Sequence, residues 1–172
     1  HSAVDGFMPP PGATWSQEMC DPAPGDEPVM CHNDVCPENV VFRDGRAVAL
    51  LYFEFAAPGR PIRDLASLAR MCVPVETAED AARTGRGDLD PVTRLRVVAD
   101  AYGLDGAGRS ELIDVLDEQF EGSGEFVRRR MARGEQAFID MWHQLGGEQR
   151  YVRRREWFAT RRDDFERALD LR

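Results

Sequence analysis

The chain has 172 residues, which is the usual size of one globular domain. Hydrophobic residues make up 42% of it and charged residues 31%, a balance that excludes collagen-like, low-complexity and wholly disordered proteins. The longest apolar run, residues 47–53, is much shorter than the roughly 20 residues that a membrane-spanning helix requires, so we expect no contact with a membrane.

Charge restricts the partners further. The formal net charge is −9, which opposes non-specific attraction to nucleic acid or anionic lipid, so neither is expected as a partner. All 22 basic residues are Arg. Because there is no Lys, this chain cannot supply a lysine amine to any reaction.

The four cysteines, Cys20, Cys31, Cys36 and Cys72, lack the CxxC spacing of metal sites and are too sparse for a disulfide framework. We expect them to be reduced, with Cys31 packed in the interior and Cys36 on a loop surface. The first residues show no basic region followed by an apolar run, so no export signal is recognised. The sequence predicts a cytoplasmic protein, and its start at His1 rather than Met indicates a truncated N-terminus.

Residues 1–28 are rich in Pro and Gly, which predicts a connector without regular elements. Three apolar runs then predict strands, over 29–31, 40–42 and 47–53. The dipeptide Asp44-Gly45 favours a tight turn that joins the last two strands into a hairpin. The polar residues 32–39 are expected to form a loop between the first strand and this hairpin.

Downstream of the hairpin, apolar residues recur at the spacing of helices, separated at first by a polar loop over 76–89. Asp90-Pro91 is a typical helix start, and a break is expected near Gly122 and Gly124. Five helices are predicted, around 61–72, 91–102, 112–120, 127–145 and 158–169. The predicted class is α+β, mainly helical, with a small β hairpin platform near the N-terminus.

The pattern with most chemical content lies in the predicted loop. His32, Asp34 and Asn39 have the spacing H-x-D-x-x-x-x-N, which is typical of phosphotransfer catalytic loops. There, the Asp accepts the proton of the substrate hydroxyl while the Asn holds a magnesium ion. One short loop can thus address the acceptor oxygen and the phosphate-bound metal together. The alternative, a polar turn without catalytic meaning, stays open on this spacing alone.

Residues 29–66 resemble the aminoglycoside phosphotransferase and choline kinase family, whose typical form is HGDLHPGNVLF, a hairpin, and IDF[DE]xAGPGxPxxDLA. The matching residues are His32, Asp34, Pro37, Asn39, Asp44, Gly45, Phe53, Glu54, Pro58, Gly59, Asp64, Leu65 and Ala66. The resemblance implies the C-terminal lobe of a protein-kinase-like fold. We expect 1–172 to form one such lobe, with a connector (1–28), the catalytic loop and hairpin (29–55) and a helical subdomain (61–172).

The resemblance also implies roles for individual residues. Asp34 would be the catalytic base, His32 would brace the catalytic loop, and Asn39 would bind magnesium. Asp64, at the start of the next helix, would hold the loop backbone by hydrogen bonds. The implied reaction transfers the γ-phosphoryl group of ATP to a hydroxyl of a small molecule, such as an aminoglycoside or another bacterial metabolite.

One departure from the family affects the metal. The second metal ligand of the family, an Asp just before the Phe-Glu pair, is replaced here by Tyr52. A neutral phenol cannot replace a carboxylate that chelates magnesium. If the strand continues past this point, Glu54 would face the same side as Tyr52 and could act as a substitute ligand.

A second departure affects the nucleotide. Only about thirty residues precede Asp34, without a Gly-rich strand-turn-strand or a Lys, so the N-terminal nucleotide lobe is expected to be missing. We therefore expect the chain as given to bind neither ATP nor magnesium tightly and to be inactive alone. The competing hypothesis is a pseudokinase-like module that binds a small molecule without catalysis. A lobe lacking its partner would expose apolar surface, which predicts a homo-oligomer.

Charged runs on the predicted helices have an ordinary interpretation. Arg128–Arg130, Arg153–Arg155 and Arg161-Arg162 lie among acidic residues, so they are expected to form solvated, ion-paired helix faces. An acidic run between Asp105 and Glu121 is interpreted in the same way. The alternative, that this run receives a cationic or polyhydroxylated substrate, stays open.

Overall fold

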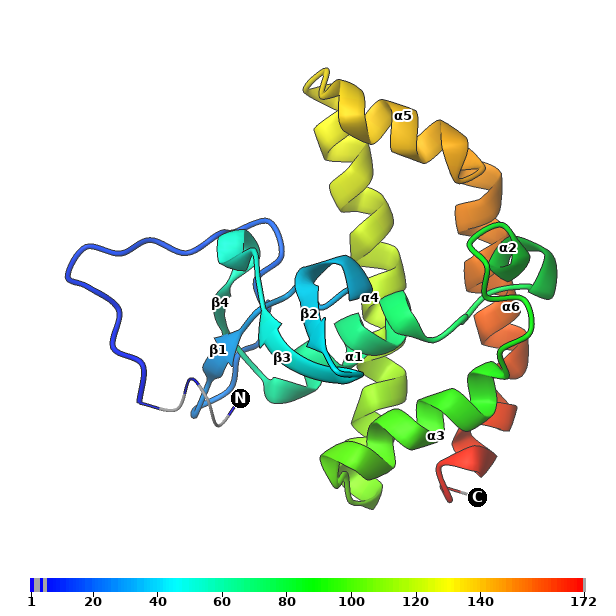
Figure 1. Ribbon diagram of the computed structural model, residues 1–172, viewed down its shortest axis with the longest axis horizontal. Helices are drawn as coiled ribbons and strands as arrows, with labels where there is room; N and C mark the ends of the chain where they lie inside the picture. Colours follow the sequence, from blue (N-terminus) through cyan, green and yellow to red (C-terminus); the bar gives the residue numbers. More distant parts are fainter. Residues whose placement is uncertain (2–3, 5, 172) are drawn as a thin grey trace. The chain divides into compact units, whose positions relative to one another are not determined.

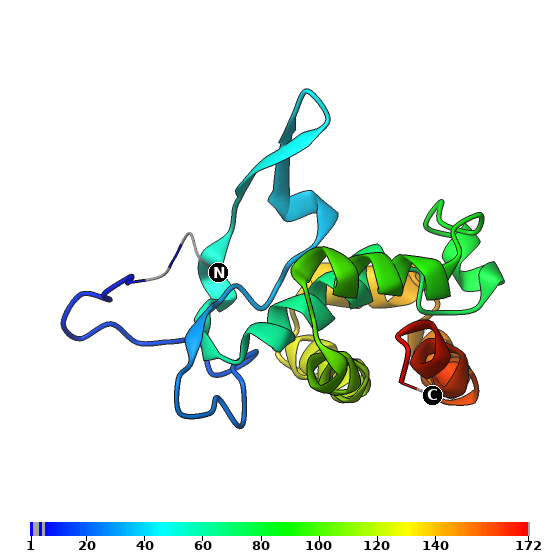
Figure 2. The same ribbon diagram turned by 90° about the horizontal axis from the view of Figure 1, so that it is seen from below.

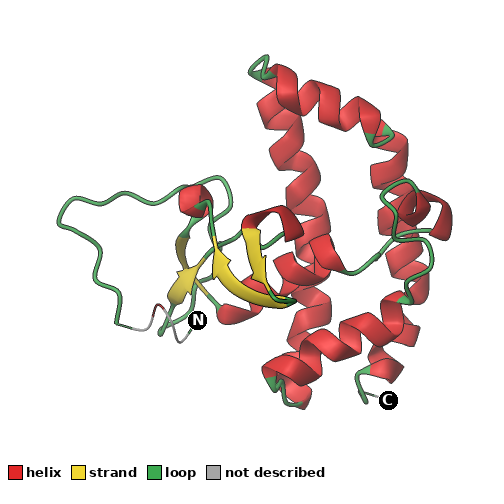
Figure 3. Ribbon diagram, viewed as in Figure 1, coloured by secondary structure: helices red, strands yellow, loops and turns green. Residues whose placement is uncertain are grey.

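The computed structural model describes His1, Val4 and residues 6–171, and it divides into two compact units (Figure 1). Unit 1 comprises His1–Cys72 and unit 2 comprises Val73–Arg172. Every strand that the model describes lies in unit 1, and the long helices lie in unit 2 (Figure 3). The predicted α+β class is therefore confirmed. That the two units together form one kinase-like lobe stays a prediction.

Unit 1 is built on two small antiparallel sheets. Strand β1 (Val29–Cys31) pairs with β4 (Ala57–Gly59), and α1 (Pro61–Cys72) packs against β1. Strands β2 (Val40–Arg43) and β3 (Arg46–Leu50) form a hairpin, which projects from the rest of the unit (Figure 2). The predicted Asp44-Gly45 turn joins them, and both of its residues adopt the positive φ that such a turn requires.

The predicted connector is held to the rest of unit 1 by a buried carboxylate that sequence reasoning missed. Residues 6–28 form loops and turns, as expected. Within them, the side chain of Asp21 accepts hydrogen bonds from Nε and the backbone N of Arg60, at 2.9 and 3.0 Å. Burial acts to raise the pKa of Asp21, but the bonds from Arg60 outweigh it and leave that pKa below its usual value. A Cβ on Gly59 would lie 3.1 Å from Asp21 Cβ, so the close approach favours Gly there.

The predicted strand over 47–53 is wrong at its C-terminal end. Strand β3 ends at Leu50, Tyr52 adopts a left-handed backbone conformation, and a short 3₁₀ helix covers Phe53–Phe55. The alternation of side chains along a strand therefore does not extend to these residues. The expectation that Glu54 shares a strand face with Tyr52 is therefore wrong.

Unit 2 consists of helices. These are α2 (Ala78–Ala82), α3 (Pro91–Tyr102), α4 (Gly106–Ala132), α5 (Gln136–Gln144) and α6 (Gly147–Ala168). Helices α3, α4 and α5 all contact α6. The predicted cap of α3 is present, since the Asp90 carboxylate accepts from the N–H groups of Val92 and Thr93. Buried aromatic rings join α4 to α6, where Phe120 and Phe158 lie 5.2 Å apart edge to face.

The predicted break near Gly122 and Gly124 is wrong, because α4 continues through both to Ala132 and the chain turns at Gly134 with φ 76°. Gly124 is small for a packing reason. A Cβ placed on it would lie only 2.5 Å from Cζ of Tyr151 on α6, whereas a Cβ on Gly122 would meet nothing within 4 Å. Gly124 thus permits close packing of α4 against Tyr151 of α6, whereas Gly122 has no such role.

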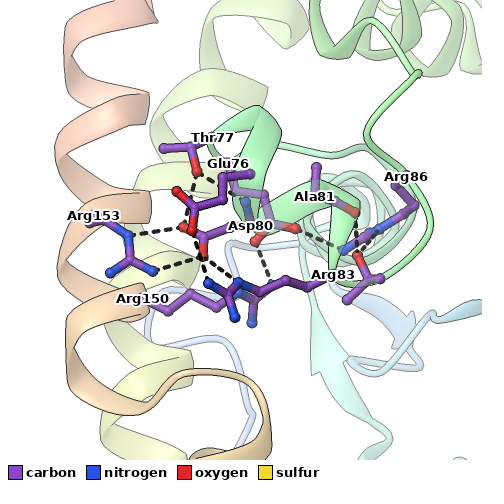
Figure 4. A network of polar contacts seen from close by, with 10 residues as sticks. Glu76, Thr77, Asp80, Ala81, Arg83, Arg86, Arg150 and Arg153 are labelled. Carbon is purple, nitrogen blue, oxygen red and sulfur yellow. Dashed lines mark hydrogen bonds and ion pairs between the residues drawn. The ribbon is translucent and has the colours of Figure 1, made fainter.

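The predicted polar loop over 76–89 contains α2 and two buried carboxylates (Figure 4). Glu76 forms ion pairs with Arg86, at 3.0 Å, and with Arg150 of α6. Asp80 accepts from Nε and Nη2 of Arg153, at 3.1 and 2.7 Å. These bonds with Arg153 lower the pKa of Asp80. In the sequence these charged residues resemble those of an ordinary polar loop. In the structure, the ion pairs of Glu76 and Asp80 join the segment around α2 to α6.

Other arginines on the helices pair with acids, in agreement with the expected ion-paired faces. Examples are Arg128 with Glu148, Arg130 with Glu135, Arg155 with Glu121 and Arg162 with Asp114. Among the described residues, no helix combines the length and apolar character needed to cross a membrane.

We expect Gly124→Ala to destabilise the protein by about 1–3 kcal/mol, because the added methyl group overpacks the contact with Tyr151. Gly122→Ala is the matched control on the same helix. It should stabilise the protein by about 0.5–1 kcal/mol through helix propensity alone. Urea unfolding of both variants measures the difference, and equal stabilisation by the two would show that the α4–α6 contact is misplaced.

We expect Asp80→Asn to lower the free energy of unfolding by about 1–3 kcal/mol near neutral pH, because it breaks a buried charged pair. The pKa of Asp80 is depressed in the folded state, so its stabilisation is present above the unfolded pKa and is lost as pH falls below about 4. The variant and the parent should thus converge in acid. Glu79→Gln, in an exposed pair with Arg83, should change stability by less than about 0.5 kcal/mol at either pH.

Candidate functional site

The loop between β1 and β2 brings together the two residues that the spacing singled out. The Nδ2 atom of buried Asn39 donates to the backbone oxygen of Asp34 at 2.8 Å and to its carboxylate Oδ2 at 3.0 Å. Asp34 itself is half-buried. The amide nitrogen makes both bonds, so the amide oxygen of Asn39 and the second carboxylate oxygen of Asp34 lie outside this contact. The contact therefore leaves one oxygen of each side chain available to another partner.

Asp64, in the first turn of α1, holds the start of this loop. Its Oδ2 accepts from the backbone N of His32 and its Oδ1 from the backbone N of Asn33, both at 2.8 Å. Burial raises the pKa of Asp64, and the two N–H donors act in the opposite direction. Both carboxylate oxygens are thereby fixed to successive peptide groups immediately before Asp34.

Asn33 has a structural role that sequence reasoning missed. Its backbone is left-handed, with φ 65°, a conformation that Gly adopts freely and that Asn tolerates better than most residues. The family pattern has Gly at this place, which is the signal that could have identified the constraint. The side-chain Nδ2 of Asn33 donates to the backbone oxygen of Phe55 at 2.9 Å. Ser67 of α1 secures the same stretch, since its Oγ accepts from the backbone N of Val35 at 3.2 Å.

His32 connects the loop to the segment after β3. Its Nε2 lies 2.7 Å from the backbone oxygen of Leu51, and its Nδ1 accepts from the backbone N of Asp34 at 3.2 Å. A carbonyl can only accept, so the ring carries its proton on Nε2. The ring also packs edge to face on Phe53, with centroids 4.6 Å apart. His32 therefore positions Asp34 through the backbone and makes no direct contact with its carboxylate.

Tyr52 lies between two carbonyl groups that the loop holds. Leu51 oxygen is bound by His32 and Phe55 oxygen by Asn33, and between them Tyr52 has φ 61° and ψ 65°. This region is costly for a bulky residue and well tolerated by Asp or Asn. The Tyr52 side chain is 66% exposed and Glu54 is also exposed. The backbone is thus shaped for a residue of the type that the family places here.

Two more groups lie near Asp34. The guanidinium of Arg70 on α1 interacts electrostatically with Asp34: burial lowers the pKa of Arg70, and the negative charge of Asp34 acts to raise it. Cys36 is buried, which contradicts its predicted place on a loop surface. Burial, followed by the charge of Asp34, raises the pKa of the Cys36 thiol to about 11, so it is a poor nucleophile near neutral pH. All four cysteines are free thiols, as expected.

The donor set fits only part of the magnesium site that the resemblance implies. Mg²⁺ prefers oxygen ligands in near-octahedral geometry. Of the two positions that the resemblance makes metal ligands, Asn39 offers an amide oxygen, and Tyr52 supplies a neutral phenol instead of a carboxylate. Because Glu54 belongs to the 3₁₀ helix and not to a strand, its predicted substitution has no geometric support. The implied pair of metal ligands is therefore incomplete.

Comparisons with known proteins show which family the sequence belongs to. Residues 8–99 match the model of the phosphotransferase enzyme family, which is more than half of the chain and includes the whole loop and α1. A curated relative, the trifolitoxin immunity protein of Rhizobium leguminosarum bv. trifolii, is 29% identical over 117 residues, which are 67% of this chain and 45% of that protein. The chain thus spans less than half the length of this relative. No solved structure matches it significantly. The chain belongs to the phosphotransferase enzyme family.

Proposed function

We propose that this chain carries the acceptor-binding half of a kinase-like phosphotransferase that acts on a small-molecule hydroxyl. The observation that supports this most directly is the Asp34–Asn39 contact on a loop held by Asp64. A carboxylate held there accepts the proton of the acceptor hydroxyl as its oxygen bonds to the γ-phosphorus of ATP and the bond to the ADP oxygen breaks. Asp34 is the proton acceptor, and Arg70 offsets its negative charge.

The chain as it stands does not complete this reaction, because Tyr52 supplies no carboxylate for the divalent metal that family members generally use. Removing one of a few charged groups from a phosphoryl-transfer site costs several kcal/mol of transition-state stabilisation, which is a thousandfold or more in rate. We expect the loop to bind an acceptor and the chain to leave it unphosphorylated.

A pseudokinase-like binding module is the second candidate. Tyr52 favours it, because an exposed aromatic side chain beside the loop offers a stacking surface in place of a metal ligand. The curated relative is named for immunity to trifolitoxin and not for phosphoryl transfer, which points in the same direction. The two candidates differ in what one substitution at position 52 should do.

If the site is a phosphotransferase site that lacks one carboxylate, Tyr52→Asp should create a divalent metal site. Asp tolerates the left-handed backbone at this position and adds the missing oxygen ligand. Titration with Mn²⁺, followed by paramagnetic broadening in NMR spectra, should show saturable broadening centred on the Asn39 side-chain amide. The unsubstituted chain should show none, and Asn39→Ala added to Tyr52→Asp should abolish the effect.

Tyr52→Asn is the control, since it fits the same backbone without adding a charge. It should behave like the unsubstituted chain. Saturable Mn²⁺ broadening centred on the Asn39 side-chain amide of the unsubstituted chain would mean that Glu54 or another group already completes the site. A failure of Tyr52→Asp to gain binding would reject the phosphotransferase proposal in favour of a remodelled binding module.

A further inference from the structure

A second group of potential metal ligands includes Asp64, the residue that binds the start of the loop. His1, Cys31 at the end of β1 and Asp64 in the first turn of α1 each direct one ligand atom to the same place. These atoms all lie within 4.8 Å of one another, and His1 Nε2 is 3.2 Å from Asp64 Oδ2. The three side chains come from three segments of unit 1 that are far apart in the sequence.

The spacing suits a tetrahedral ion. Bonds of about 2.0–2.3 Å to nitrogen, oxygen and sulfur place the ligand atoms of a tetrahedral zinc site roughly 3.3–3.8 Å apart. The present separations need to shorten by at most about 1.5 Å to reach that geometry. Of the three ligands, His1 alone lies outside a strand or helix, whereas Cys31 belongs to β1 and Asp64 to α1.

One of the ligands is already oriented by other bonds. The backbone N–H groups of His32 and Asn33 fix the Asp64 carboxylate, and each oxygen keeps a further lone pair. Such hydrogen bonds to a ligating carboxylate are a regular feature of metal sites in proteins. The Cys31 thiol donates to the backbone oxygen of Arg60 at 3.3 Å, and a metal ion would take the place of that proton.

The charges around the group favour a cation. Cys31 is fully buried, and the charged side chains that act on it are Asp64, Asp21 and Arg63. Asp21 is paired with Arg60, which leaves Asp64 and the thiol as the acidic groups at this place. A bound divalent ion takes the thiolate form directly.

We propose that His1, Cys31 and Asp64 bind a Zn²⁺ ion, with water as the fourth ligand. A set of one thiolate, one imidazole and one carboxylate selects zinc over magnesium, which prefers oxygen ligands. The ion joins the N-terminal segment to the carboxylate that holds His32 and Asn33, so its binding stiffens the catalytic loop. The proposal does not depend on whether the loop phosphorylates an acceptor.

Titration of the full chain with Co²⁺, a spectroscopic substitute for Zn²⁺, tests the site directly. We expect one equivalent of Co²⁺ to give the thiolate charge-transfer band and the intense visible bands of tetrahedral cobalt, and Zn²⁺ to remove both. Zn²⁺ should also raise the unfolding temperature, because it binds the folded chain in preference to the unfolded one.

Cys31→Ser should lose the charge-transfer band, and His1→Ala should weaken Co²⁺ binding at least tenfold while the chain stays folded. Cys36→Ser is the matched control, since Cys36 is also buried but lies outside the group. It should bind like the parent. Absence of the band in the parent, its persistence in Cys31→Ser or unchanged affinity in His1→Ala would each overturn the proposal. Because His1 lies outside the strands and helices, His1→Ala keeps the test valid even if Cys31→Ser does not fold.

Discussion

The arrangement of unit 1 depends on one buried carboxylate bound to two successive peptide groups. Asp64 accepts from the backbone N–H groups of His32 and Asn33, and this sets the backbone from which Asp34 projects. Hydrogen bonds to a charged, buried acceptor are stronger than ordinary ones, and neither N–H has solvent as an alternative. The bonds also explain why Asn33 can keep its left-handed conformation, since the surrounding contacts fix it.

The same constraint extends to the segment after the hairpin. His32 and Asn33, once held by Asp64, bind the carbonyl groups of Leu51 and Phe55 and so fix the backbone on both sides of Tyr52. These contacts involve backbone atoms at positions 51 and 55 and make no demand on the side chain at 52. The backbone around position 52 is therefore held whichever side chain stands there. This separation of backbone shape from side-chain chemistry underlies both candidate functions.

Much of this was predictable from local sequence. The hairpin followed from the apolar runs on either side of Asp44-Gly45, and the start of α3 from Asp90-Pro91, because these signals act within a few residues. The family resemblance was confirmed by the match over residues 8–99. The motif spacing singled out Asp34 and Asn39, whose side chains form a hydrogen bond in the loop.

The rest depended on contacts between distant segments. No local sequence pattern marks Asp21 as structurally important, yet its side chain binds Arg60, which is 39 residues away. Glycines at 122 and 124 look alike in the sequence, and only the nearness of Tyr151 separates their roles. The end of β3 was misplaced because Tyr52 and Phe53 have high strand propensity, which the bonds from His32 and Asn33 override.

Amide hydrogen exchange at His32 and Asn33 tests the central role of Asp64 most directly. In Asp64→Asn, the side chain keeps one acceptor and places an NH₂ group against the second peptide N–H. Exchange at the two amides should accelerate by about tenfold or more, the loss of roughly one hydrogen bond, while Asp44→Asn at the hairpin turn should leave both unchanged. Unchanged exchange of both amides in Asp64→Asn would contradict the account, because the loop would then be held by something else.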